Sequence, residues 1–121
     1  MKKMYVFGNE HLPEDAFALK VADHLRLQGV SIVHCTTPES LLEAEEDELI
    51  ILDVVKDLAE PAVIDPDRIR TNRMMSLHDL DVGHIIELGQ AMGIIKKLKI
   101  IGVPQKGNPQ KIAEQVKQWI P

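Results

Sequence analysis

The sequence predicts an α/β protein of the doubly wound class, in which one mostly parallel sheet carries helices on both faces. Three observations support this. The chain has 121 residues, which is the size of one domain. Aliphatic runs alternate along it with segments of helical period. Its contents of 45% hydrophobic and 27% charged residues are those of a globular protein with one core. Residues 1–121 are therefore expected to form a single domain.

The first strand and the first helix are marked by turn residues. Residues 4–7 form a short apolar run that ends at Gly8-Asn9, as a buried strand followed by a tight turn does. Pro13 suits the first position of a helix, and the acids after it favour the positive helix end. We expect this helix to end before Gly29. Apolar side chains recur along it with helical period: Phe17, Ala18, Val21, Ala22 and Leu25.

The next segment contains the strongest strand. Residues 30–35 predict a second strand, and Pro38 opens a short helix. The acidic run 43–48 is expected to be solvated surface. Residues 49–55 form a continuous aliphatic run, which is typical of a central parallel strand covered on both faces. Asp53 interrupts this run.

The second half alternates in the same way. Residues 62–64 predict a short edge strand, 66–77 a loop and 97–103 the last strand. Between them, apolar residues at 82–92 have the spacing of an amphipathic helix that Gly93 ends. Its apolar positions are Val82, Ile85, Ile86, Gly89 and Met92. The final helix is capped by Asn108-Pro109, and its apolar positions are Ile112, Val116 and Ile120.

The charge balance and the apolar pattern exclude several partners. The chain has 14 basic and 19 acidic residues, a net charge of −5 and no basic tract, so neither nucleic acid nor an anionic membrane surface is expected to bind it. No stretch approaches the roughly 18 apolar residues of a membrane span, and the apolar N-terminal run is too short for a secretion signal. Cys35, the only cysteine, cannot form a disulfide within the chain. These features predict a soluble protein of the cytoplasm.

Three side chains are expected at the carboxyl edge of the sheet, where ligands of such folds bind. Asp15 follows the turn after the first strand, Asp53 lies toward the end of the third, and His78 stands at the entrance to the penultimate helix. Two carboxylates and an imidazole suit a divalent ion such as nickel, zinc or manganese, with coordination positions left open. The other histidines are assigned structural or surface positions: His11, His24, His34 and His84.

Each of the three residues also has a structural interpretation. The Asp15 carboxylate would interact favourably with the positive end of the first helix. His78 would cap the helix at whose entrance it stands, or it would be a surface residue. Asp53 is harder to explain in this way, because a carboxylate within a buried run needs a partner or access to solvent. The sequence contains none of the common zinc-protease, serine-hydrolase or dinucleotide-binding motifs. The metal hypothesis therefore depends on the three residues together.

These features resemble the hydrogenase maturation endopeptidases, which remove the C-terminal tail of the large-subunit precursor of nickel-iron hydrogenases after nickel insertion. The likeness rests on four segments: Gly8-Asn9 with Glu14-Asp15, residues 49–55, Ser76-Leu77-His78-Asp79-Leu80, and residues 100–103. Their order and approximate spacing agree with the family over nearly the whole chain.

The resemblance implies a peptidase whose catalytic and nickel-engaging residues are Asp15, Asp53 and His78. It implies that the nickel is carried by the protein substrate, the hydrogenase large-subunit precursor, and that no permanent metal is held. Nickel would then act as a recognition handle for the protease. The chain departs from the family pattern where Ala16 and Phe17 replace the glycines that usually follow the acidic pair.

Two other functions stay open at this point. A phosphoacceptor receiver domain also has an acidic pair after its first strand and an Asp at the end of its third, and Lys106 would be its basic residue. It is less favoured because Glu14 follows a whole loop and because 61–77 do not supply the expected strand-helix unit. The second alternative is a non-proteolytic metal-binding assembly module.

Overall fold

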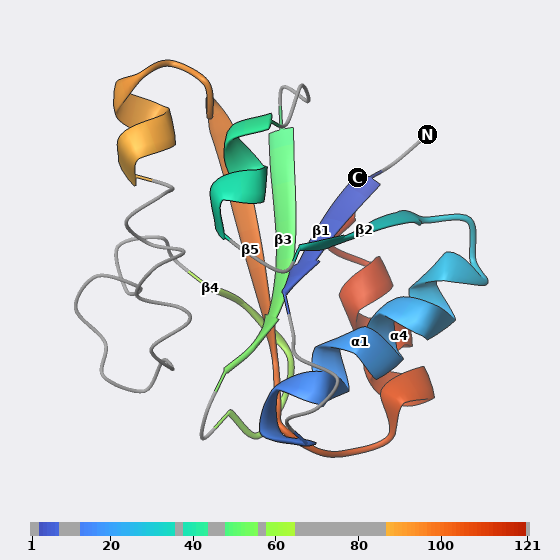
Figure 1. The fold of residues 1–121 in the computed structure, drawn as a ribbon. Coiled ribbons are helices and arrows are strands. Elements are labelled where there is room, and N and C mark those ends of the chain that lie inside the picture. The colour runs from blue at the N-terminus through green and yellow to red at the C-terminus, as the bar shows by residue number, and fades with distance from the viewer. Residues whose placement is uncertain are drawn as a thin grey trace.

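The computed structural model describes residues 3–7, 13–35, 38–43, 48–55, 58–64 and 87–120, with the backbone alone at 13–15 and 38–40. These residues contain a five-stranded sheet of order β2-β1-β3-β5-β4 (Figure 1). The strands are β1 (Lys3–Phe7), β2 (Ser31–Cys35), β3 (Glu48–Val54), β4 (Ala62–Ile64) and β5 (Lys97–Val103). Neighbouring strands are parallel except for β4, which pairs antiparallel with β5 at the edge. The predicted α/β class and its mostly parallel sheet are confirmed.

Helical segments cover both faces of this sheet. Helix α1 (Pro13–Arg26) and helix α4 (Pro109–Lys117) pack against each other on one face (Figure 1). The 3-10 helix η1 (Pro38–Glu43) and the helical residues 87–91 lie on the other. These two meet where Gly89 approaches the Leu42 side chain. In the described ranges, no helix has both the length and the apolar character that a membrane crossing requires.

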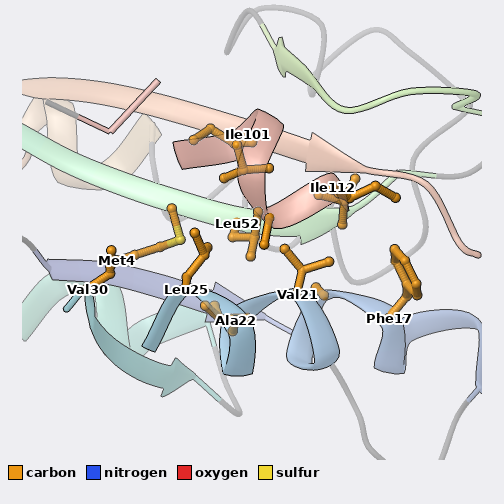
Figure 2. Close-up of a cluster of buried hydrophobic side chains, with 14 of the residues drawn as sticks. Met4, Phe17, Val21, Ala22, Leu25, Val30, Leu52, Ile101 and Ile112 are labelled. Carbon is orange, nitrogen blue, oxygen red and sulfur yellow. The ribbon is translucent and has the colours of Figure 1, made fainter. Parts of the chain in front are cut away.

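Alternation along β3 divides the core into two layers. Ile50, Leu52 and Val54 face α1 and α4, whereas Leu49 and Ile51 face the η1 side. Figure 2 shows the α1/α4 layer, in which the side chains of the two helices meet those of the sheet. Its labelled members are Met4, Phe17, Val21, Ala22, Leu25, Val30, Leu52, Ile101 and Ile112. Burial on both faces explains why β3 is aliphatic almost throughout.

Both ends of α4 have polar partners. At the start, Asn108 Oδ1 accepts hydrogen bonds from the backbone N–H groups of Gln110 (3.0 Å) and Lys111 (3.3 Å). Such a cap contributes about 1 kcal/mol to stability. Beyond the end, Lys99 Nζ donates to the carbonyl of Trp119 at 2.9 Å, a cation at the negative helix end. The predicted cap is confirmed.

Glu48, the last residue of the acidic run before β3, is less exposed to solvent than predicted. Glu48 belongs to β3 and is half-buried, and its Oε1 atom is buried with no hydrogen-bond partner. Glu43 is exposed as expected. The prediction for Glu48 was wrong because β3 begins one residue before the aliphatic run. Glu48 is therefore part of the strand, and its carboxylate is partly buried.

The predicted apolar face of the penultimate helix also needs a correction. Met92 is 61% exposed and follows the helical residues, in the turn that contains Gly93 at φ +75°. Ile95 takes the packing position instead, since its Cδ1 lies only 2.6 Å from where a Cβ on Gly89 would be. The other predicted positions of this helix, Val82, Ile85 and Ile86, and the predicted loop 66–77 lie outside the described residues.

Cys35 provides a prediction about alkaline stability. Its side chain is 1% exposed, and burial raises the pKa of the thiol from its ordinary value of 9.0 to about 11. The folded protein therefore binds more protons than the unfolded chain between these pH values, so stability is lost as pH rises through this window. We expect urea unfolding at pH 9 to 11 to show a steeper loss for the wild type than for Cys35→Ala. Parallel losses in the two proteins would show that Cys35 does not cause the effect.

Candidate functional site

Asp53 lies near the carboxyl end of β3, the strand between β1 and β5. With 8% of its surface exposed, it is the one buried polar or charged side chain among the residues that the structure describes. A carboxylate in this position loses most of its hydration, which is unfavourable unless a hydrogen bond or a cation compensates. Its burial therefore requires a structural or a functional explanation.

Part of the compensation comes from the backbone. Asp53 Oδ1 accepts a hydrogen bond from the N–H group of Val54 at 2.9 Å. Among the described residues, β3 pairs with β1 as far as Leu52 and with β5 as far as Val54. The carboxylate thus accepts from a backbone donor of β3 that lies beyond the Val6–Leu52 pair. This is a structural role that sequence inspection did not identify.

The pleat of β3 determines where the Asp53 side chain points. Because Leu52 and Val54 face α1 and α4, Asp53 between them belongs to the opposite, η1 side. Its neighbour across the sheet on this side is Gly102 of β5. The only other recorded neighbour strand, β1, reaches the same level at Phe7, one residue beyond the Val6–Leu52 pair. Asp53 therefore lies level with the last residue of β1, and its neighbour on β5 is a glycine, which has no side chain.

The other two predicted site residues are located less completely. The backbone of Asp15 lies in the first turn of α1, the helix that follows β1. Since β1 neighbours β3, the start of α1 and Asp53 are at the same edge of the sheet, although α1 packs on the face opposite to that of Asp53. His78 lies outside the described residues. Within those that are described, no three His, Cys, Asp or Glu side chains form a group that could hold a metal. The three-residue site remains a prediction.

Gly102 is a position that the sequence analysis did not connect with the site. A Cβ atom here would lie 2.6 Å from Val55 Cγ2 and 3.1 Å from Ile64 Cγ1. Only glycine fits between the strand end that carries Asp53 and the edge strand β4. An isolated glycine within an aliphatic strand was the available sequence signal, because it indicates close approach of a neighbour.

We expect Gly102→Ala to destabilise the protein by about 1–3 kcal/mol, the usual cost of overpacking a core. The added methyl group must displace Val55 or Ile64. Urea unfolding measures the change, and Gly102→Ala/Val55→Ala provides the control. If the contact with Val55 causes the effect, the double variant is more stable than the sum of the single changes implies. Additive losses would contradict this assignment.

The strand order distinguishes the fold from that of receiver domains. Flavodoxin-like sheets, to which receivers belong, have the order 2-1-3-4-5. Among the strands that the structure describes, β5 lies directly beside β3, and β4, which comes between them in sequence, is a short antiparallel edge. This arrangement disfavours the phosphoacceptor interpretation of Asp53 and Lys106.

Three solved structures share this fold over nearly the whole chain. The first is the hydrogenase maturating endopeptidase HybD from E. coli, with a TM-score of 0.69 and 21% identity over 96% of this chain and 90% of that one. The second is the hydrogenase 3 maturation protease, with a TM-score of 0.71 and 20% identity over 99% and 89%. The endopeptidase HycI from Escherichia coli gives 0.70 and 20% over the same shares.

Sequence comparison adds no closer relation. No protein-family model matches the chain, and no curated protein matches it significantly. At about 20% identity the structural likeness establishes a shared fold. The predicted resemblance to hydrogenase maturation endopeptidases is therefore confirmed at the level of the fold.

Proposed function

We propose that this protein is an endopeptidase that removes the C-terminal tail of a nickel-iron hydrogenase large-subunit precursor after nickel insertion. The observation that carries the proposal is the agreement in fold with three hydrogenase maturation proteases, each over at least 96% of this chain. The buried carboxylate of Asp53 at the carboxyl edge of the sheet supports it.

In this proposal the nickel belongs to the substrate. The Asp15 and Asp53 carboxylates and the His78 imidazole occupy open coordination positions of the nickel that the precursor carries, since oxygen and imidazole nitrogen are suitable ligands for this ion. The protease thereby binds only a precursor that has received its metal. Such dependence requires no permanent metal in the protease. The compartment that we propose for this activity is the cytoplasm.

The burial of Asp53 favours this use. The carboxylate has little hydration and accepts a hydrogen bond from Val54, and a cation at the strand end would pair with it favourably. By the same argument, we expect the nickel-free precursor not to be a substrate, because it lacks the cation that would pair with the carboxylates.

The test is incubation of the protein with nickel-loaded and nickel-free large-subunit precursor from the same cell, followed by intact mass measurement. Loss of a C-terminal peptide from the loaded form alone is the expected result. Cleavage of both forms would contradict nickel recognition. Binding of the loaded form without cleavage would overturn the peptidase proposal in favour of the assembly module.

A further inference from the structure

Two hollows lie on either side of the loop that follows β5, at the carboxyl edge of the sheet. One, of about 520 Å³, is lined by Leu58, Ala59, Pro104, Gln105 and Lys106. The other, of about 210 Å³, is lined by Phe17, Lys20, Gln105, Lys106, Gly107 and Pro109. The dipeptide Gln105-Lys106 belongs to both. The loop after β5 thus separates a hollow beside the segment that follows β3 from a hollow beside the start of α1.

The two hollows combine apolar walls with positive charge. Leu58 and Pro104 line the first, and Phe17 and Pro109 line the second. Lys106 is exposed between them, and Lys20 adds a second exposed ammonium group at the α1 side. Within the described part of the chain neither lysine has an ion-pair partner. These two lysines are the charged residues among those that line the two hollows, in a protein whose net charge is −5.

The start of α4 does not supply this positive charge. Two of its backbone N–H groups, those of Gln110 and Lys111, already donate to Asn108 Oδ1. The lysine ammonium groups are therefore the donors available to an anion, and the half-buried Gln105 side chain can both donate to and accept from a peptide backbone.

We propose that these hollows bind an extended segment of the protein substrate in which two acidic side chains alternate with apolar ones. The acidic groups pair with Lys106 and Lys20, and the apolar side chains enter the hollows on the two sides of Gln105-Lys106. This inference rests on the proposed function, because it assigns the hollows to the peptide on which the carboxyl-edge site acts. The charge complementarity selects an acidic segment over a basic or neutral one.

A peptide titration followed by ¹H–¹⁵N NMR tests the inference without nickel or cleavage. The probes are the hexapeptide acetyl-Ala-Val-Glu-Val-Glu-Ala-amide and two matched peptides with Gln or Lys in place of Glu. At low salt we expect the Glu peptide to bind at least about fivefold more tightly than the Gln peptide, as two exposed ion pairs permit. The amide signals that shift are expected to be those of Phe17, Leu58, Gln105 and Lys106.

Two double variants separate this site from general charge attraction. Lys20→Gln/Lys106→Gln is expected to abolish the preference for the Glu peptide. Lys111→Gln/Lys117→Gln removes the same charge from the exposed side of α4 and is expected to keep it. Equal binding of Glu and Gln peptides, a preference that survives the first variant, or absence of shifts at millimolar peptide would each overturn the inference. None of these outcomes depends on cleavage of the precursor. The peptide titration and the cleavage assay therefore test the two proposals separately.

Discussion

Replacing Asp53 by asparagine is expected to abolish processing of the nickel-loaded precursor while leaving the protein folded. The amide oxygen of asparagine can still accept the hydrogen bond from Val54, but it lacks the charge that the nickel interaction requires. We expect a loss of at least about a hundredfold, because even outer-shell partners of metal sites cost 10–100-fold when removed. The rate of tail release, followed by intact mass, measures it.

The alanine variant serves as the matched comparison for stability. Asp53→Ala leaves the Val54 N–H group without its side-chain acceptor, which is expected to cost about 1–3 kcal/mol in urea unfolding. Asp53→Asn should unfold close to the wild type. If the asparagine variant processes the precursor normally, Asp53 only satisfies the backbone of β3 and has no part in the chemistry.

Removing either of the other proposed ligands is expected to weaken nickel binding strongly. Asp15→Asn and His78→Ala each take away one of three donors, and we expect each to reduce affinity by at least about tenfold. Calorimetric titration of the isolated protein with Ni²⁺ measures the change. It also tests whether the three residues act together, which their positions in the sequence predict.

A histidine elsewhere on the protein provides the control for this titration. His24 lies within α1 and is half-buried, away from the proposed ligands in sequence. His24→Ala should bind nickel as the wild type does. If it loses as much affinity as His78→Ala, binding is distributed over surface histidines and the assigned site is wrong.

The strands were predictable because each leaves a strong local signal. The bounds 97–103 and 62–64 agree with β5 and β4, and the aliphatic run 49–55 differs from β3 by one residue at each end. A parallel strand buried on both faces must be apolar throughout, so its sequence has few alternatives. Turn-forming glycines and prolines then separate the elements.

Features that depend on packing between distant segments could not be predicted in the same way. That Gly102 is required follows from the positions of Val55 and Ile64, which the sequence does not bring together. The burial of Glu48 and the exposure of Met92 also depend on the exact strand start and on where the chain turns. Local pattern gives the element but not these contacts.

For Asp15 and Asp53, the position in the sheet could be predicted from the sequence, whereas the direction of the Asp53 side chain could not. The rule that ligands bind at the carboxyl edge placed Asp15 and Asp53 at one edge from the sequence alone, and the order of β1 and β3 agrees with it. The pleat then directs Asp53 to the η1 side, whereas α1 packs on the other. If Asp15 and Asp53 share an ion, as we propose, that ion lies beyond the strand ends, where the two faces meet.

The most direct test of this central claim is paramagnetic line broadening by substoichiometric Mn²⁺ in the ¹H–¹⁵N spectrum. If Asp15, Asp53 and His78 share one divalent ion, amide signals next to all three residues broaden together, and Asp53→Asn abolishes the effect at all of them. Broadening confined to the acidic run 43–48, or unchanged broadening around Asp15 and His78 in the variant, would contradict the claim.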